Sequence, residues 1–221
     1  MHEATQSTTQ PATKKGEETR DRILAAATEL IHQRGYKATG VAEIVAASGV
    51  PKGSFYFYFA SKEELGRVLL QRYRERQHEE LARIFPEDAE AIPTIRGFFE
   101  SAVRMQADAG CKSGCLLGNL AAEITESEDL RKELAGVLHD LQQALAGAVA
   151  RGQARGELST DFAPEAAADF FLSVFEGSIL LAKARRDPQA LEASLSMLAR
   201  YLETLRRVAA SNPPAGKEGR A

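Results

Sequence analysis

The sequence predicts an all-α protein. Hydrophobic residues recur at the three- and four-residue spacing of amphipathic helices along most of the chain. No segment combines alternating hydrophobicity with an Asn-Gly or Asp-Gly hairpin turn, so no sheet is expected. The 221 residues, 44% of them hydrophobic, suffice to bury a core without disulfides or a structural metal. We therefore expect helices to form the whole fold.

Polar segments flank the predicted helices. Residues 1–17 are rich in Ser, Thr, Gln and Pro, and residues 211–221 are similar, so we expect two disordered tails. The N-terminus has no apolar signal segment, and no apolar run reaches the roughly 18 to 20 residues of a membrane helix. We expect a cytoplasmic, reducing compartment, no membrane partner and cysteines that are thiols.

The net charge of −3 is unevenly distributed. Residues 1–76 contain 12 Lys and Arg against 9 Asp and Glu, whereas the remainder contains 16 against 22. A mildly basic front is consistent with an anionic partner for the N-terminal part.

Two short helices are predicted at the N-terminal end. The first starts at Thr19, places Ile23 and Leu30 at helical spacing and stops at Gly35. The second covers residues 41–48, with Thr39 as its N-cap and Gly49 as its end. A longer helix follows after Ser61, which forms a capping box with the glutamate three residues later.

The rest of the chain is predicted to be a series of longer helices. The helix after Ser61 extends to Phe85, and Pro86 and Pro93 mark a linker. Further helices are expected over residues 94–109, 115–125, 128–156, 164–186 and 188–209. Pro164 and Pro188 suit the first turns of the last two.

Residues 55–59 read FYFYF in a chain with 15 Phe and Tyr and no Trp. Propensity alone favours a strand, but only a turn and about two helical turns fit between Gly49 and Ser61. On a helix, Phe55 and Phe59 share one face and can pack into a core, while the residues between them point elsewhere. Residues 41–59 thus have the layout of a helix-turn-helix, whose second helix enters the major groove of DNA.

Residues around this second helix have the chemistry that DNA contacts require. Lys52 and Lys62 bracket the helix and can neutralise phosphates on either side. Gly53 leaves room for backbone N–H groups to approach a phosphate.

The stretch TGVAEIVAASGVPKGSFYFYFASKEEL resembles the DNA-binding domain of the tetracycline-repressor family, over about residues 19–66. The resemblance implies a homodimer in which residues 18–62 form a DNA-binding domain and residues 63–210 form a helical effector and dimerisation domain. The implied partners are double-stranded operator DNA and a small-molecule or electrophilic effector. No cofactor is expected. The predicted DNA-binding residues are Thr39, Gly40, Lys52, Gly53, Ser54, Tyr56, Phe57, Tyr58 and Lys62. Position 57 is frequently His in such motifs; Phe57 could instead contact a thymine methyl group.

Residues 114–123, GCLLGNLAAE, resemble a branch of the same family with repressors responsive to N-ethylmaleimide-like electrophiles and to acrylate. The resemblance implies roles in sensing for Cys115 and Lys183. Independently, Cys115, Asn119 and Glu123 are spaced by four and form a polar row on one helix face, so we expect Asn119 and Glu123 to be effector contacts together with Cys115. The first turn of a helix favours the reactive thiolate form of Cys115. Lys183 continues an apolar stripe on a later helix.

Other interpretations of the same residues stay open. Cys115 can be an inert small side chain or a pocket wall, and Lys183 can simply suit the end of its helix. Cys111 and Cys115 lack the second pair that a zinc site needs, so no metal is expected. His32, His78 and His139 are expected at the surface, and the charged residues at 72–80 on a solvated face.

The predicted function is that of a homodimeric repressor, which an effector releases from a palindromic operator. Two alternatives belong to other functional classes. One is a helical interaction protein that does not bind DNA. The other is an enzyme with Cys115, His139 and Asp140 as a nucleophile system, for which the sequence supplies no oxyanion hole. We therefore expect a regulator and not an enzyme.

Overall fold

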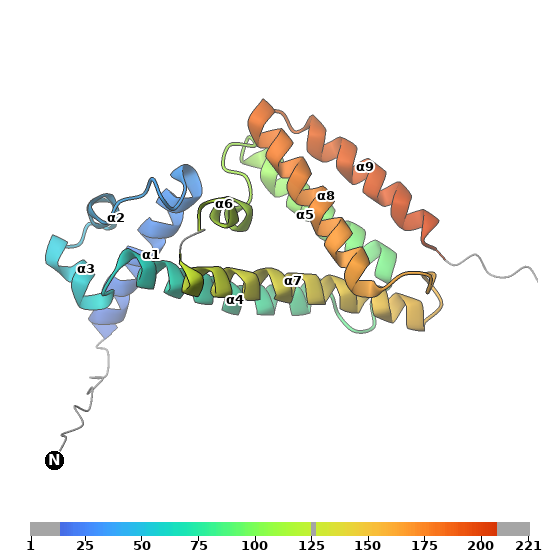
Figure 1. The fold of residues 1–221 in the computed structure, drawn as a ribbon, viewed down its shortest axis with the longest axis horizontal. Coiled ribbons are helices and arrows are strands. Elements are labelled where there is room, and N and C mark those ends of the chain that lie inside the picture. Colours follow the sequence, from blue (N-terminus) through green and yellow to red (C-terminus); the bar gives the residue numbers. More distant parts are fainter. Residues whose placement is uncertain (1–13, 125–126, 207–221) are drawn as a thin grey trace, which may run out of the picture. The chain divides into compact units, whose positions relative to one another are not determined.

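The computed structural model describes residues 14–124 and 127–206, and its named elements are all helices (Figure 1). They are α1 (Lys14–Arg34), α2 (Val41–Ser48), α3 (Lys52–Tyr58), α4 (Lys62–Ile84), α5 (Ala91–Asp108), α6 (Leu116–Glu123), α7 (Glu128–Ala154), α8 (Pro164–Arg185) and α9 (Gln189–Thr204). A single β-bridge joins Leu158 to Arg206 in this part of the chain. The predicted all-α class is confirmed.

The described chain forms two compact units. The first contains residues up to Glu79 and residues 111–140, and the second contains residues 80–110 and those from Leu141 onward. Helices α4 and α7 each contribute residues to both units. The predicted domain boundary between residues 62 and 63 falls inside the first unit and, as a functional division, stays a prediction.

The core of the first unit joins α1, α2 and α3 to the start of α4 and to α6. Helix α1 packs on α2 and on α6. Phe55 and Phe59 are buried with Ile23, Ile44 and Leu65 in one apolar cluster, which confirms the predicted core face of α3. Figure 1 shows α1, α2 and α3 as a three-helix group beside the start of α4. This packing fixes α3 at the surface of the unit.

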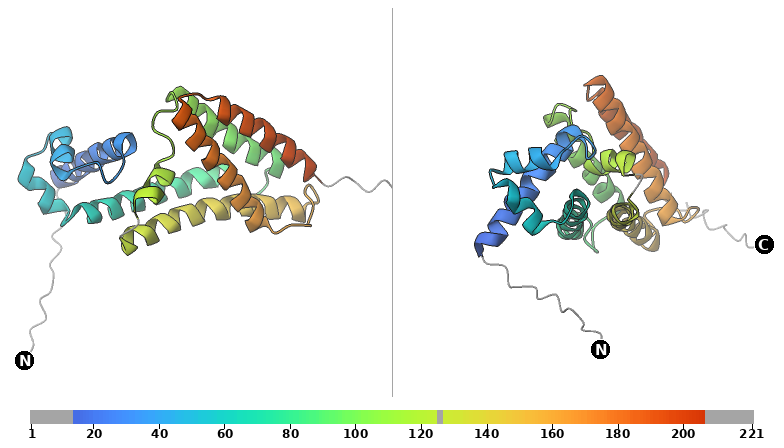
Figure 2. Two further views of the ribbon diagram at one scale, coloured as in Figure 1. Left: turned by 45° about the horizontal axis from the view of Figure 1, so that its top comes forward. Right: turned by 60° about the vertical axis from the view of Figure 1, so that its left-hand side comes forward.

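The core of the second unit lies among α5, α8, α9 and the later part of α7. Figures 1 and 2 show α5, α8 and α9 side by side, and α9 packs on both α5 and α8. Phe99 and Phe171 are fully buried, with their ring centres 6.4 Å apart. Aromatic rings thus fill the contact between α5 and α8.

Several helix bounds differ from the prediction. Helix α1 begins at Lys14, so residues 14–17 belong to it and not to a tail, and residues 1–13 and 207–221 lie outside the described residues. Helix α5 begins at Ala91 because a first turn tolerates Pro93, whose missing N–H has no intrahelical partner there. Pro164 is in the first turn of α8 as predicted, whereas Pro188 is the N-cap of α9. The predicted helix ends at residues 125 and 209 also lie outside the described residues.

The N-terminal caps confirm one prediction and correct two. Ser61 Oγ accepts a hydrogen bond from the Glu64 N–H at 3.0 Å, but the Glu64 carboxylate binds the N–H of Ala60 and not that of Ser61. Thr39 is not the N-cap of α2, because its hydroxyl donates to the Gly35 carbonyl at 2.7 Å and its side chain is buried. Gly40 takes the N-cap position, and its N–H donates to Glu43 Oε2 at 2.9 Å.

The charged residues of α4 are not a purely solvated face. Arg74 donates two hydrogen bonds to the Asp140 carboxylate on α7, and His78 Nε2 lies 3.0 Å from the same carboxylate. The hydrogen bond from Arg74 is the main reason that the pKa of Asp140 lies below its usual range. No helix in the described ranges is both long and apolar enough to cross a membrane.

Candidate nucleic-acid interface and sensor helix

A tight glycine turn joins α2 to α3. Gly49 closes α2 in the left-handed conformation, with φ +63°, and Pro51 is the N-cap of α3. Arg22 of α1 donates to the carbonyl oxygens of Ser48 at 2.7 Å and Gly49 at 2.9 Å. These bonds satisfy carbonyl groups that a helix end leaves without partners. Helix α1 thereby fixes the turn that orients α3.

Helix α3 has one buried and one exposed face. Phe55 is fully buried, and its ring centre lies 5.7 Å from that of Phe59. On the other face, Tyr56 is 63% and Phe57 82% exposed, which is unusual for large aromatic side chains. A Cβ placed on Gly53 would meet no atom within 4 Å, so the backbone of this helix is open at that point.

The other predicted DNA-binding residues differ in exposure. Lys52 is exposed, whereas Ser54 and Tyr58 are half-buried. The ring of Tyr58 meets that of Phe57 edge-on, with centres 5.0 Å apart, so it braces the exposed ring. Gly40 is half-buried at the N-cap of α2. The buried side chain of Thr39 is not exposed for a contact with DNA.

Lys62 is half-buried at the start of α4 and lies against Tyr36. Its Nζ lies 4.4 Å from the centre of the Tyr36 ring and donates to the Lys37 carbonyl at 3.4 Å. Burial lowers the pKa of Lys62, and the charge of Glu123 partly opposes this shift. Burial, and then the charge of Glu63, raise the pKa of Tyr36 to about 12. Lys62 thus belongs to a contact network as well as to the predicted interface.

The segment before α6 holds the two cysteines, which are not joined by a disulfide. Cys111 is buried and has a positive φ of 52°. Cys115 is half-buried and is the N-cap of α6, one position before the first turn in which the sequence placed it. This position still faces the positive end of the helix dipole, which favours a thiolate.

The remaining predicted sensor residues have different neighbours. Asn119 donates to the Ser113 carbonyl at 2.7 Å and so closes the turn before α6. Glu123 accepts a hydrogen bond from the backbone N–H of Lys37 at 2.7 Å. Lys183 is half-buried on α8, in the second unit, and follows the buried Ile179 on the predicted stripe. Its pairing with Cys115 stays a prediction.

Two contacts of this region were missed from the sequence. His32 is half-buried and not simply a surface residue, because its Nε2 lies 3.2 Å from the Gly114 carbonyl beside Cys115. Asp140 is held by Arg74 and His78, so it is not available to orient His139 as the enzyme alternative requires. His139 itself is exposed. No local sequence pattern predicts the contact between His32 and Gly114, since the two residues are 82 positions apart.

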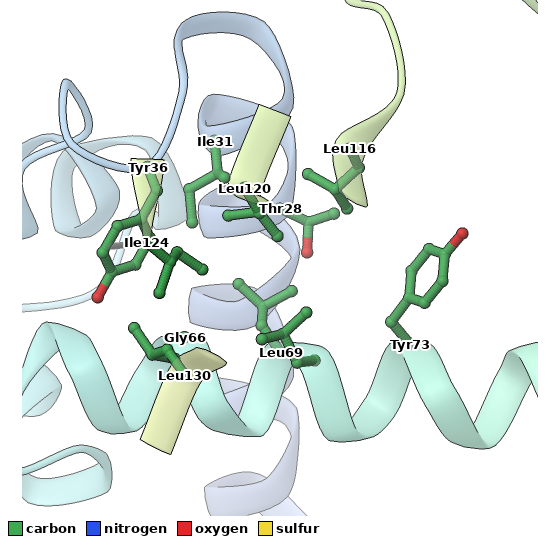
Figure 3. Close-up of a pocket in the computed structure, with 11 residues that line it drawn as sticks. Thr28, Ile31, Tyr36, Gly66, Leu69, Tyr73, Leu116, Leu120, Ile124 and Leu130 are labelled. Carbon is green, nitrogen blue, oxygen red and sulfur yellow. The ribbon is translucent and has the colours of Figure 1, made fainter. Parts of the chain in front are cut away.

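An apolar cavity of about 20 Å³ lies where α1, α4 and α6 meet (Figure 3). Figure 3 shows side chains of these helices and of α7 around it, among them Ile31, Leu69, Leu116, Leu120, Ile124 and Leu130. A cavity of this size has room for about one water molecule, and the surface exposed inside it is apolar. Helix α6 therefore packs on α1 and α4 without filling the space between them.

Comparisons with known proteins agree with this geometry. Residues 23–67 match the bacterial regulatory proteins of the tetR family, and residues 91–198 match a tetracyclin repressor-like C-terminal domain. The chain is 36% identical to the transcriptional regulator AcuR of Cereibacter sphaeroides, over 82% of this chain and 84% of the relative. It is 31% identical to the HTH-type transcriptional repressor NemR of Escherichia coli K12, over 85% and 95% of the two chains.

A solved structure gives the same result. The crystal structure of the reduced form of E. coli NemR has a TM-score of 0.78 and 28% identity, and the match covers 87% of this chain and 99% of that chain. The chain therefore belongs to the tetracycline-repressor family of bacterial transcriptional regulators, as a DNA-binding repressor with a helix-turn-helix and not as an enzyme.

Proposed function

We propose that the chain is a homodimeric repressor that binds a palindromic operator through α3 and leaves it when an electrophilic or small-molecule effector acts on the C-terminal part. The observation that carries the DNA-binding half of this proposal is the exposed face of α3, with Lys52, Tyr56 and Phe57, on a helix anchored by buried Phe55. An exposed aromatic face beside a cation suits the major groove, where apolar methyl groups and charged phosphates lie close together.

Each side chain of this face has a distinct proposed role. Lys52 and Lys62 bind phosphates, which gives affinity without sequence information. Ser54 and Tyr56 read base edges through their hydroxyl groups, and Phe57 contacts a thymine methyl group. Gly40 and Gly53 bring the backbone close to the DNA, and Tyr58 supports the ring of Phe57.

The proposed dimer interface is the exposed apolar face of α8 and α9. Its large side chains are Phe170, Leu180, Leu181, Met197 and Tyr201, each more than 40% exposed. Leu198 and Leu202 of α9 do not belong to this face, because both are buried inside their own unit. We expect Leu180→Glu to give a monomer in light scattering, whereas Met105→Glu, an equally exposed site on α5, leaves the dimer intact.

The proposed sensor is the thiol of Cys115. Its thiolate adds to the electron-poor C=C bond of an electrophile such as N-ethylmaleimide: a C–S bond forms, the π bond breaks, and water protonates the neighbouring carbon. Cys111 is 2% exposed, so the half-buried Cys115 should react first. The ammonium group of Lys183 is proposed to favour the thiolate. The added bulk at the N-cap then displaces α6.

The experiment combines both halves of the proposal. A duplex selected from a random library by the wild-type protein is titrated at several salt concentrations, and N-ethylmaleimide is then added. Lys52→Ala should lower the salt slope by about 1. Release by N-ethylmaleimide should be lost in Cys115→Ser and retained in Cys111→Ser, and alkylation should slow in Lys183→Ala. Absence of any salt-dependent duplex binding would instead favour an interaction protein.

A further inference from the structure

Glu123, the last residue of α6, reaches the loop that joins α1 to α2. Its Oε2 accepts a hydrogen bond from the Lys37 N–H at 2.7 Å. Its Oε1 lies over Gly35, where an added Cβ would come within 2.1 Å of it. Gly35 has a φ of +93°, a conformation that favours glycine. The loop therefore presents both an N–H donor and the open side of a glycine to this carboxylate.

Lys62 holds the same loop from its other side. Its Nζ donates to the Lys37 carbonyl at 3.4 Å, and the Tyr36 hydroxyl donates to the Lys62 carbonyl at 3.2 Å. Glu123 and Lys62 thus bind the N–H and the carbonyl of a single residue, Lys37. Because Lys62 is also a proposed phosphate ligand, the place of its ammonium group depends on this loop.

Helix α6 is held at both ends by polar contacts, and a small apolar cavity lies beside the residues between them. At its N-terminal end, Gly114 meets His32 of α1, and at its C-terminal end Glu123 meets Lys37. Between these ends lies the apolar cavity that Leu116 and Leu120 help to line. A displacement of α6 along or across the cavity therefore acts on the DNA-binding helices at the two anchored ends.

We propose that Glu123 is a positioning residue for operator binding, which holds the α1–α2 loop, and with it Lys62 and the start of α2, in the place that DNA requires. The inference rests on the proposed function, because it concerns a duplex bound through α3. The loop continues through the buried Thr39 to Gly40, the N-cap of α2, and α2 leads directly into the turn before α3. The assignment differs from the sequence expectation, which placed Glu123 among the effector contacts.

The test uses three substitutions that separate reach from charge. Glu123→Gln keeps an acceptor at the same reach, Glu123→Asp keeps the charge but is one methylene group shorter, and Glu123→Ala removes both. Glu75→Ala is the control, since it removes the same charge from an exposed site of the same unit. For each full-length variant we would measure affinity for the selected duplex, thermal stability and hydrogen exchange of the Lys37 amide.

We expect the Lys37 amide to exchange about tenfold faster, and the duplex to bind about tenfold more weakly, in Glu123→Ala and Glu123→Asp, as for loss of a hydrogen bond to a charged group. Glu123→Gln and the Glu75→Ala control should stay within about threefold of wild type. A Glu123→Gln variant that binds as weakly as Glu123→Ala would overturn the proposal.

A readout that does not require DNA separates this inference from the proposed function. An unchanged exchange rate of the Lys37 amide in Glu123→Ala sinks the inference even if the wild type binds the duplex. The other outcome is that the Lys37 amide exchanges faster in the variants but no form of the protein binds a duplex. This outcome rules out the proposed function, and with it the role of Glu123 in DNA binding. If Glu123→Ala fails to fold, the comparison of Glu123→Gln with Glu123→Asp decides the matter.

Discussion

Helices α3 and α6 are both short and pack on the same core, but they use their other faces in opposite ways. On α3 the face away from the core carries exposed Tyr56 and Phe57. On α6 the polar side chains of Asn119 and Glu123 bind backbone groups of neighbouring segments. The difference separates an exposed face, which we propose binds DNA, from a face whose polar side chains contact the chain's own backbone.

The largest expected effect is on the anchor of α3. Phe55→Ala removes a fully buried ring, so we expect the free energy of unfolding to fall by about 3–5 kcal/mol in urea denaturation. Phe57→Ala, on the exposed face of the same helix, should change it by about 0.5 kcal/mol or less. Equal losses in the two variants would mean that α3 has no distinct core and partner faces.

The next effect concerns the loop that α6 holds. Gly35→Ala introduces a Cβ at φ +93° and within 2.1 Å of Glu123 Oε1, so we expect a loss of about 1–3 kcal/mol in the free energy of unfolding. In a Glu123→Ala background the same substitution should cost less, because only the backbone strain is left. A double-mutant cycle without coupling would show that the carboxylate does not occupy this space.

A smaller effect tests what α3 reads. Replacing a contacted thymine by deoxyuridine removes one methyl group. Burying one such carbon is worth about 0.8 kcal/mol, so the affinity of the wild-type protein should fall by about fourfold. The Phe57→Ala variant should bind both duplexes equally, because it lacks the ring that is proposed to contact the methyl group. Fluorescence anisotropy with single deoxyuridine substitutions along the site gives the measurement. If no position shows this dependence on the Phe57 ring, its proposed role is wrong.

A further effect, confined to alkaline solution, is a dependence on pH at Tyr36, in the loop between α1 and α2. Its pKa of about 12 lies above the usual 10.0, since burial disfavours the charged phenolate. A raised pKa in the folded state stabilises the protein fully below pH 10 and is lost as the pH rises toward 12. The free energy of unfolding should therefore fall over this interval, and fall less steeply in Tyr36→Phe. Parallel pH profiles would contradict this assignment.

The sequence predicted the parts of the molecule that local patterns determine. The Gly49 turn, the Ser61 cap and the four-residue spacing of Phe55 and Phe59 were enough for the helix-turn-helix and its core face. Local chemistry also misled: Thr39 has an N-cap side chain, but its hydroxyl binds Gly35 instead. A short-range pattern cannot decide whether this hydroxyl accepts a hydrogen bond from a helix N–H or donates one to a nearby carbonyl.

Contacts across long stretches of chain were not predictable in this way. Glu123 and Lys37 are 86 residues apart, and the sequence grouped Glu123 with Cys115 because of helical spacing alone. That spacing says which residues share a face and nothing about what the face meets. The position of Glu123 over Gly35 depends on how α1 and α6 pack together. Only the tertiary structure shows this packing.

We also expect the apolar cavity among α1, α4 and α6 to make this region more compressible than its surroundings. Hydrostatic pressure favours states with less internal void volume, so a repressor with an unfilled space beneath α6 should respond to moderate pressure there before its tightly packed aromatic core does. Volume changes measured by high-pressure spectroscopy would then report on the same helix that electrophiles are proposed to displace, without any chemical modification of the protein.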